Sequence, residues 1–347
     1  MRILHLMLSN YYIDNVTYQE NLLTRQNLMD GHLVRIIAST ETFVSPNRLG
    51  YVKPSTYTNE DGIEVTRIPY RKLLPLKVMA KIRSYSGLYK MIENFKPDVI
   101  LHHGVPSYEL LTLVKYKKKH PNIKLYLDSH EDFHNSARNF ISREILHRSF
   151  YGPIARKAIA YVDKILCINI EAFDFLNSLY KIPFEKMELF PLGGIIFPEN
   201  EVLEKRLKIR NELGISRDEI LMVHTGKMQK RKRTVELLKA FVQVKDEKMK
   251  LYLIGELTSD VESAVKPIIK SDERIKHLGW MSGDKLIDFL CATDVYLQPG
   301  SQSATLQNAI CCGCAVMIFP HKSHVPYLND NGYYVKTEKD MINVFEK

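Results

Sequence analysis

The sequence lacks the features that mark a membrane-spanning or secreted protein. None of its apolar runs approaches the roughly 20 residues that a membrane-spanning helix needs. The apolar start at residues 1–6 is too short for a signal peptide and has no small-residue cleavage site, so we expect it to form a first buried strand. Only five cysteines occur in 347 residues. We therefore expect a cytoplasmic protein whose cysteines remain reduced.

Two common nucleotide-binding motifs are also missing. Residues 9–15, which follow the first apolar run, contain no glycine. A G-x-G-x-x-G turn is therefore impossible there, and a dinucleotide-dependent dehydrogenase loses its main support. The G-x-x-x-x-G-K-[ST] phosphate loop is absent as well. The sequence also shows no internal repeat, no low-complexity tract and no long linker.

The composition is that of an ordinary globular protein with an excess of positive charge. The chain is 45% hydrophobic and 26% charged, has a formal net charge of +9, and is long enough for two domains. The charge favours anionic partners such as nucleic acid, lipid head groups or phosphorylated substrates. Residues 70–96 carry seven Lys or Arg and one Glu among interleaved apolar residues. This segment is either an amphipathic contact to an anionic membrane surface or a solvated helix face packed on its own domain.

Short apolar runs alternate with longer helical patterns along the whole chain, which predicts βα units and parallel sheets. In the first half the expected strands are 3–8, 33–38, 65–68, 99–102, 124–127 and 164–168. In the second half they are 220–225, 250–254, 275–278, 295–298, 315–319 and 333–335. We predict an α/β protein with two Rossmann-like, doubly wound domains, residues 1–192 and 193–347, that face each other across a crevice. Ligands of such domains bind beyond the carboxyl ends of the strands.

The most informative segment is residues 223–238, where a strand, a glycine, a cluster of cations and a helix follow one another. Gly226 ends the strand, and residues 227–233 include five Lys or Arg. Cations at a helix N-terminus oppose the helix dipole and cost stability unless an anion binds there. A diphosphate would be held both by the cations and by the free N–H groups of the helix. The alternative is a basic loop exposed to water, but the order of the elements favours the phosphate site.

A second polar loop follows the strand at 295–298. Gly300 would let the backbone approach a ligand closely. Ser301 or Ser303 is predicted to cap a helix that begins near residue 303. Capping and ligand contact are compatible, because the first turn of this helix faces the crevice in either case.

Together these two segments resemble the retaining GT-B glycosyltransferases of the family 4 type, also called glycosyl transferases group 1. Weaker similarities follow in the family's order along nearly the whole chain: GHLV at 31–34, KPDVI at 96–100, DSHE at 128–131, VDKI at 162–165 and LGW at 278–280 followed by 284–296. Each piece alone is weak, whereas their order and spacing together are specific.

The resemblance implies a nucleotide-sugar site in the C-terminal domain. The family's GR-x4-K signature, which holds the donor diphosphate, falls on Gly226, Lys227 and Lys232. Lysine stands where arginine is usual, so the charge is kept while bidentate geometry is lost. The family's E-x7-E pair, which contacts the sugar and the ribose, falls on Gly300 and Asn308.

The missing glutamates leave sugar recognition to other groups. Asn308 still offers an amide to a ribose hydroxyl. The loop Ser301, Gln302 and Ser303 is expected to contact the donor through hydroxyl and amide groups. Glu256 is a further candidate near the nucleoside, with a surface loop acid as the equal alternative.

By the same resemblance, His130 faces the donor sugar from the N-terminal domain. The alternative is a histidine that a neighbouring carboxylate holds for local structure, and we favour the site. Glu131 and Asp132 are weaker candidates, either as acceptor contacts or as charges at a helix start. Asn15 and Tyr18, which follow the first strand, are also predicted on the acceptor side.

The chemistry implied by the resemblance is glycosyl transfer with retention of configuration. The leaving diphosphate gains negative charge while the sugar becomes oxocarbenium-like, so the catalyst is a preorganised positive field. We predict His130, Lys227 and Lys232 as the catalytic residues. No D-x-D motif occurs, and we expect neither a metal nor a cofactor. The expected partners are a nucleotide-sugar donor and a glycan or lipid-linked acceptor. A role in surface polysaccharide synthesis, at the inner face of the membrane, rests on analogy.

Three other functions stay open. A nucleotide-sugar epimerase of the same architecture would need crevice carboxylates, and the missing E-x7-E glutamates weaken it. A non-catalytic GT-B subunit is favoured by those same losses. A nucleic-acid binder is the weakest alternative, because the 19 tyrosines are scattered and form no basic and aromatic platform.

A zinc site is a further possibility near the C-terminus. Cys311 and Cys314 form a C-x-x-C pair, and His321 and His324 follow closely. The step from cysteine to histidine is shorter than in zinc fingers. Small buried cysteines are therefore the favoured interpretation.

Overall fold

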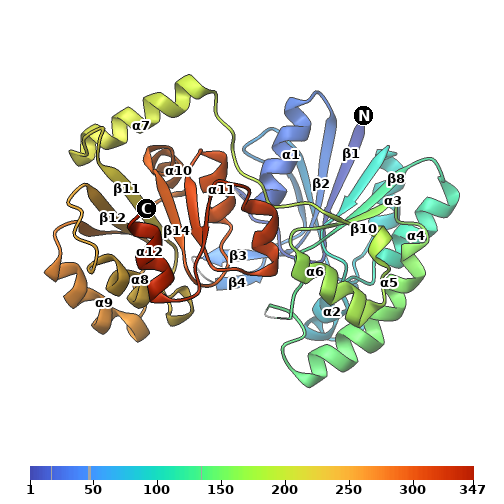
Figure 1. Ribbon diagram of the computed structural model, residues 1–347. Coiled ribbons are helices and arrows are strands. Elements are labelled where there is room, and N and C mark those ends of the chain that lie inside the picture. The colour runs from blue at the N-terminus through green and yellow to red at the C-terminus, as the bar shows by residue number, and fades with distance from the viewer. Residues whose placement is uncertain (17, 46–47, 134) are drawn as a thin grey trace. The chain divides into compact units, whose positions relative to one another are not determined.

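The computed structural model describes residues 1–16, 18–45, 48–133 and 135–347. The chain divides into two compact α/β units, unit 1 (Met1–Pro191) and unit 2 (Leu192–Lys347) (Figure 1). Each unit is built around its own mainly parallel sheet, as the alternation of apolar and helical patterns predicts. Within the described residues, no helix combines the length and apolar character needed to cross a bilayer.

Unit 1 contains an eight-stranded sheet in the order β10-β9-β8-β7-β1-β2-β6-β5. Its strands are β1 (Arg2–Met7), β2 (Leu33–Ser39), β5 (Ser55–Thr58), β6 (Glu64–Ile68), β7 (Val99–His102), β8 (Lys124–Ser129), β9 (Lys164–Cys167) and β10 (Met187–Leu189). The edge strand β5 runs antiparallel to β6, whereas the other pairs are parallel. A separate antiparallel pair joins β3 (Glu41–Ser45) and β4 (Arg48–Tyr51).

Helices pack on both faces of this sheet. They are α1 (Gln19–Met29), α2 (Leu76–Ile82), α3 (Leu88–Phe95), α4 (Leu110–Lys119), α5 (Gly152–Ile159) and α6 (Ile170–Phe175), with a π-helical segment η1 (Ile141–Tyr151), a second one η2 (Leu176–Tyr180) and a 3-10 turn η3 (Phe184–Lys186). Leu4 and Leu6 of β1 belong to the larger core, while Met7 faces the smaller one beneath α1. Because both sheet faces are covered, the central strands are apolar almost without interruption.

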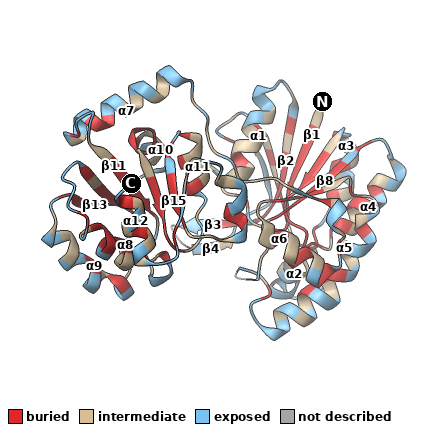
Figure 2. Ribbon diagram, in the orientation of Figure 1, coloured by how far each residue is buried: buried red, intermediate tan, exposed pale blue. Residues whose placement is uncertain are grey.

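Unit 2 contains a six-stranded, all-parallel sheet in the order β13-β12-β11-β14-β15-β16. Its strands are β11 (Ile220–Thr225), β12 (Met249–Ile254), β13 (Ile275–Gly279), β14 (Val295–Gln298), β15 (Ala315–Ile318) and β16 (Gly332–Tyr334). Its helices are α7 (Glu199–Leu213), α8 (Thr234–Phe241), α9 (Ser259–Ser271), α10 (Gly283–Ala292), α11 (Thr305–Cys311) and α12 (Glu338–Phe345), with 3-10 turns η4 (Lys230–Lys232) and η5 (Lys322–Tyr327). Buried residues follow the strands and the inward faces of these helices (Figure 2).

Each sheet has one point where the order of the strands reverses. In unit 1 this point lies between β1 and β7, and in unit 2 it lies between β11 and β14. The loops beyond the carboxyl ends of the two strands diverge there, which leaves room for a ligand. A ligand site is therefore expected in the loops that follow these four strands.

Candidate functional site

In unit 2 the loops after β11 and β14 are joined at the strand reversal. The backbone N–H of Ser301 donates to the carbonyl oxygen of Arg231 at 2.9 Å. The guanidinium of Arg233 donates to the carbonyl oxygen of Pro299 at 3.3 Å and to that of Lys336 at 2.8 Å. These bonds hold the basic segment after β11 against the polar loop after β14, at the place where α/β sheets bind ligands.

Glycines make this close packing of backbones possible. Gly226 adopts φ 108° and Gly255, which follows β12, adopts φ 134°. A Cβ atom on Gly255 would lie 2.1 Å from the carbonyl oxygen of Gly226, and one on Gly300 would lie 2.4 Å from that of Arg231. Position 300 therefore abuts the neighbouring loop, and no carboxylate side chain fits there. A glutamate at the position where the resemblance expects one would therefore clash with the loop after β11.

Lys232 is the most unusual side chain of this region. It is only 7% exposed, and its ammonium group has no hydrogen bond or ion pair to another described residue. A Cβ on Gly226 would lie 3.7 Å from its Nζ atom, so the ammonium group lies beside the turn that ends β11. Burial, and then the charge of Arg231, lower the pKa of Lys232 to about 8. A buried cation without a counter-ion is costly, and a bound anion would remove that cost.

The neighbouring Lys227 behaves differently. Its side chain is 60% exposed, and its Nζ atom lies 3.5 Å from a carboxylate oxygen of Glu256. The two residues that were predicted to contact the diphosphate and the nucleoside therefore form an exposed ion pair with each other. Exposed pairs of this kind contribute little to stability, so both side chains are free to rearrange around a ligand.

The loop after β14 offers further polar groups. The hydroxyl of Ser301 is buried and has no hydrogen-bond partner in the described parts of the chain. Gln302 is exposed, and the Ser303 hydroxyl lies 3.3 Å from that of Thr305. The prediction that Ser301 or Ser303 caps the following helix is wrong: α11 begins at Thr305, and its N-cap is Ala304, which provides no side-chain bond. The extra turn through residues 301–304 carries the chain past both serines before the helix starts.

Asn308 lies on α11 at a close contact with the start of unit 2. A Cβ atom on Gly194 would lie 2.7 Å from Oδ1 of Asn308, and the N–H of Gly193 donates to Gln307 at 2.6 Å. The amide of Asn308 therefore lies close to the backbone of Gly194, and a side chain at position 194 would not fit between them. No hydrogen bond of the Asn308 side chain to another described residue accompanies this contact.

The cysteine and histidine cluster does not assemble into a metal site. Among the described residues, no three His, Cys, Asp or Glu side chains lie in a metal-binding arrangement. Cys312 and Cys314 are buried in the core beside α11, as the sequence favoured, whereas Cys311 is only half-buried. His321 instead contacts the carbonyl oxygen of Gly300 at 3.1 Å, and His324 contacts that of Phe319.

In unit 1, His130 is linked to a buried polar chain that was not predicted. Asp128 accepts hydrogen bonds from His103 at 2.5 Å and from the N–H of Gly104 at 2.7 Å. His103 in turn contacts His5 at 3.0 Å. The Nε2 atom of His130 lies 3.6 Å from Asp128, and its side chain is 29% exposed.

The charge of Asp128 decides the protonation of His130. Burial lowers the pKa of His130, but the carboxylate of Asp128 outweighs burial and raises it to about 9. The neighbouring histidines hold the pKa of Asp128 well below its usual range, although burial acts in the opposite direction. His130 is therefore an imidazolium at neutral pH. It provides a partly exposed positive charge beyond the carboxyl end of β8.

Among the other predicted residues of unit 1, Glu131 acts on His130 through its charge and raises the pKa of the imidazole. Asn15 adopts φ 61° and its N–H donates to Glu60 at 2.7 Å. Tyr18 is 55% exposed at the start of α1. Asp132 closes a turn by accepting the N–H of Asn135 at 2.8 Å. Of the four residues predicted on the acceptor side, only Glu131 lines the polar cavity that the described residues of this unit form beside α2 and η1.

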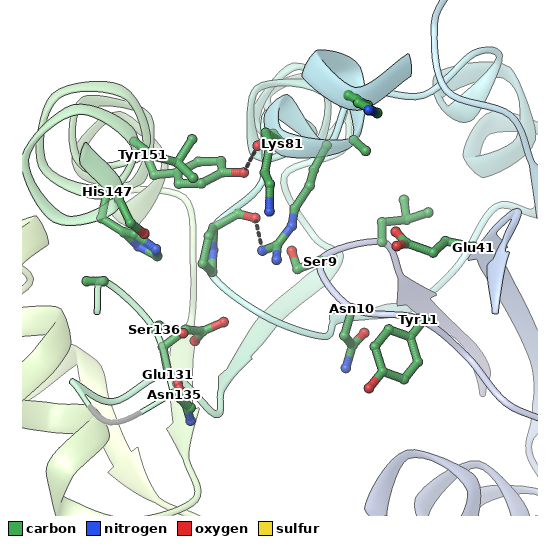
Figure 3. Close-up of a pocket in the computed structure, with 18 of the residues that line it drawn as sticks. Ser9, Asn10, Tyr11, Glu41, Lys81, Glu131, Asn135, Ser136, His147 and Tyr151 are labelled. Carbon is green, nitrogen blue, oxygen red and sulfur yellow. Dashed lines mark hydrogen bonds between the residues drawn. The ribbon is translucent and has the colours of Figure 1, made fainter. Parts of the chain in front are cut away.

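This cavity has a volume of about 670 Å³ and lies beyond the carboxyl ends of β1 and β7, at the strand reversal. Four cations line it, Lys77, Lys81, Arg83 and Arg138, together with the carboxyl groups of Glu41 and Glu131. Figure 3 shows side chains from several elements around the cavity, among them Ser9 and Tyr11 after β1 and Tyr151 of η1. Its walls are thus built by segments that are far apart in the sequence.

Two groups on the floor of the cavity are held firmly. The guanidinium of Arg83 donates to the carbonyl oxygen of Pro106 at 2.8 Å, and its carbon lies 5.9 Å from the centre of the Tyr151 ring. Glu131 accepts the hydroxyl of Ser129 at 2.8 Å, and burial raises the pKa of its carboxyl group. Neither Arg83 nor Arg138 was predicted as a site residue. For Arg83 the available signal was the high density of basic residues in 70–96, but that density did not indicate a cavity.

Comparisons with known proteins agree with the predicted fold. Residues 219–346 match the profile of the family Glycosyl transferases group 1. No curated protein matches the sequence. Among solved structures, a glycosyltransferase from Rickettsia africae is similar with a TM-score of 0.66 and 13% identity, over 99% of this chain and 87% of that chain.

Two further solved structures carry nucleotides. The Anabaena protein HepE in complex with UDP is similar with a TM-score of 0.63 and 14% identity, over 99% of this chain and 89% of that chain. The catalytic domain of starch synthase IV from Arabidopsis thaliana, bound to ADP and acarbose, gives a TM-score of 0.64 and 13% identity, over 99% and 90%. The predicted GT-B fold is confirmed, and the resemblance to glycosyl transferases group 1 is confirmed for residues 219–346.

Proposed function

We propose that the chain is a glycosyltransferase that binds a nucleotide-sugar donor in unit 2. The observation that carries this proposal is Lys232, a buried ammonium group beside the glycine turn that ends β11 and without a counter-ion among the described residues. The partnerless hydroxyl of Ser301 adds a second polar group in the loop bonded to Arg231. A cation and a hydroxyl that lack protein partners at a strand reversal fit a diphosphate.

The proposed reaction moves the sugar with retention of configuration and without a metal. As the bond between the anomeric carbon and the diphosphate oxygen breaks, the negative charge on the diphosphate grows. Lys232 would stabilise this charge from a fixed position, while Lys227 would leave Glu256 to join it. Fixed charges in a water-poor site stabilise a developing anion most effectively, because they need no reorganisation.

Unit 1 would bind the acceptor. His130, protonated at neutral pH, provides a positive charge on this unit. Glu131 would accept a hydrogen bond from an acceptor hydroxyl, since its carboxyl group lines the cavity. The acceptor would be a glycan or lipid-linked sugar in surface polysaccharide synthesis, on the cytoplasmic side of a membrane.

The chain contains a built-in reporter for the donor site. Trp280 is its single tryptophan and is 79% exposed. It directly follows β13, so it lies beyond the carboxyl ends of the strands, as Gly226 does after β11 and Gly255 after β12. UDP, GDP, ADP and dTDP should be titrated at fixed ionic strength, with Trp280 fluorescence and thermal midpoint as readouts. One diphosphate should change the fluorescence and raise the midpoint. If none acts at millimolar concentration, the donor site is refuted.

A non-catalytic GT-B subunit is the second candidate, and one specific observation favours it. Gly300 and Asn308 stand where the family resemblance expects glutamates, and the packing of Gly300 leaves no room for one. A subunit of this kind would bind the nucleotide but turn nothing over. Nucleotide binding together with release of the diphosphate from the matching nucleotide sugar would decide for the enzyme.

A further inference from the structure

Two exposed apolar segments flank the cavity of unit 1. The first, the α2 arm, consists of Leu73, Leu74, Leu76 and Val78, and the second, the η1 arm, consists of Phe140, Ile141 and Ile145. Each of these side chains is between 43% and 75% exposed. Residues 72–78 are exposed without a break. Monomeric proteins rarely gather so many apolar side chains on a surface without a use for them.

The two arms belong to the same elements that build the cavity. Lys77 and Lys81 of α2 line one side, whereas Arg138 and Ser142 line another at the start of η1. The hydroxyl of Tyr151, at the end of η1, donates to the carbonyl oxygen of Lys81 (Figure 3). Both arms therefore stand next to a single opening.

The core does not need these apolar side chains. Met79 is the residue by which α2 packs inward, and η1 packs inward through His147 and Tyr151. The second half of the basic segment 70–96 packs on its own domain, because α3 buries Leu88, Ile92 and Phe95. The two interpretations of this segment therefore apply to different parts of it: α3 is packed on its own domain, whereas residues 72–78 are exposed to solvent.

The charges around the opening indicate what covers the arms. Lys72, Lys77, Lys81 and Arg138 have no hydrogen bond or ion pair from their side chains to any described residue. The two carboxyl groups of the cavity lie deeper: Glu41 accepts the Tyr70 hydroxyl at 3.0 Å, and Glu131 is held by Ser129. Cations around an apolar rim complement an anionic lipid surface, which attracts lysine and arginine side chains near it.

We propose that the two arms dock unit 1 on an anionic bilayer, and that the cavity binds the phosphate-bearing head group of a lipid acceptor from that bilayer. The apolar side chains would enter the boundary between head groups and acyl chains, and Lys81, Arg83 and Arg138 would bind the phosphate. This inference rests on the proposed glycosyl transfer, because it names the class of acceptor for that reaction.

The first test measures binding of the full chain to vesicles. Vesicles of phosphatidylglycerol and phosphatidylcholine should bind the chain, and vesicles of phosphatidylcholine alone should bind it far less. Leu73→Ser with Leu74→Ser, or Ile141→Ser with Ile145→Ser, should reduce binding to the vesicles about tenfold or more, because each pair removes apolar area that the bilayer would bury.

The matched control changes two leucines of similar exposure elsewhere. Leu203 and Leu207 on α7 are 54% and 53% exposed and belong to unit 2. Leu203→Ser with Leu207→Ser should leave vesicle binding unchanged. Failure of the unaltered chain to bind anionic vesicles overturns docking, and so does an equal loss in the control pair.

The second test examines the cavity with soluble probes, by calorimetry. Hexyl phosphate should bind more tightly than inorganic phosphate and hexyl glucoside, and Lys81→Gln with Arg138→Gln should abolish the difference. Lys115→Gln with Lys118→Gln, on α4, is the control for charge alone. If inorganic phosphate binds as tightly as hexyl phosphate, the acceptor is a soluble phosphorylated molecule. If hexyl glucoside binds as tightly as hexyl phosphate, the cavity does not recognise a phosphate. Either result overturns the lipid acceptor.

The donor readout separates this inference from the proposed function. The arm and cavity variants lie in unit 1, so the response of Trp280 to the nucleotide should persist in each of them. A chain that binds the nucleotide but neither vesicles nor hexyl phosphate keeps the proposed function and loses this inference. A chain that binds vesicles but no nucleotide loses the glycosyl transfer on which the acceptor depends.

Discussion

Replacement of Lys232 by methionine should stabilise the free protein while it destroys donor binding. Burial lowers the pKa of this side chain from 10.5 to about 8. At neutral pH the folded state therefore keeps a proton that its environment disfavours by about 2.5 pKa units, which corresponds to a penalty on the order of 3 kcal/mol. Methionine keeps most of the apolar stem and removes the charge. The free energy of unfolding should rise by as much as this penalty.

The sign of the pH dependence provides an independent check. Between pH 8 and 10.5 the unfolded chain binds more protons at this position than the folded chain, because the folded pKa is depressed. The wild-type protein should therefore gain stability from this group as the pH rises through that window. The Lys232→Met variant lacks this gain, so the difference between the two proteins should shrink from pH 8 toward pH 10.5.

Urea unfolding and calorimetry of the full chain at several pH values measure this difference. Lys270→Met, at an exposed position near the end of α9, serves as the control and should change stability by less than about 0.5 kcal/mol. A saturating nucleoside diphosphate, at about a hundred times its dissociation constant, should add about 2.7 kcal/mol to the wild type and nothing to the variant. A variant that is less stable at neutral pH, or that binds the nucleotide as before, refutes an uncompensated buried cation.

Three more predictions concern neighbouring groups. Asp128→Asn should lower the pKa of His130 from about 9, because the variant loses the carboxylate that raises this pKa most while burial still lowers it, and a histidine titration by NMR would contradict this if the pKa stayed near 9. In the wild type, the stability gained from this protonated histidine should be complete below pH 6.5 and should disappear as the pH rises through 9, and urea unfolding should find that slope missing in Asp128→Asn. Gly300→Ala should cost about 1–3 kcal/mol of unfolding free energy and weaken nucleotide binding, since its Cβ would lie 2.4 Å from the Arg231 carbonyl oxygen; an unchanged urea midpoint would show that the loops separate freely. Asn308→Ala should weaken nucleotide binding by on the order of 1 kcal/mol in a fluorescence titration, the worth of one neutral hydrogen bond.

The central strands were predictable because their chemistry is local. Parallel strands buried on both faces must be apolar almost throughout, and β11, β7 and β14 have the bounds that the sequence predicts. The strands that were missed are the separate pair β3 and β4 and the two edge strands of the larger sheet, β5 and β10. β5 is a short polar edge strand of sequence STYT, and three of its four residues are exposed. β10 has only three residues, so neither strand has a pattern long enough to detect.

The two halves of the candidate site differ in how far their sequences could predict them. The donor half depends on backbone: a glycine turn, a closely packed loop and a cation six residues after the glycine. Such a device occupies one continuous segment, so its order along the chain reveals it. The burial of Lys232 and the loss of space at Gly300 still needed the fold, because each depends on the loop after β14, about 70 residues away.

The acceptor half is made by side chains that are far apart in the sequence and meet only in the folded chain. Lys77 and Arg138 are exposed in segments with no motif, and they become neighbours of one cavity only because α2 and η1 meet through Tyr151 and Lys81. No spacing rule connects positions so far apart in the sequence. Each exposed apolar residue near them indicates nothing by itself, because single exposed leucines are common on protein surfaces. Their meaning comes from the shared opening and from the unpaired cations beside it. A segment that is both apolar and basic, and that the core leaves outside, is better explained by a surface that demands both properties than by two separate accidents of composition.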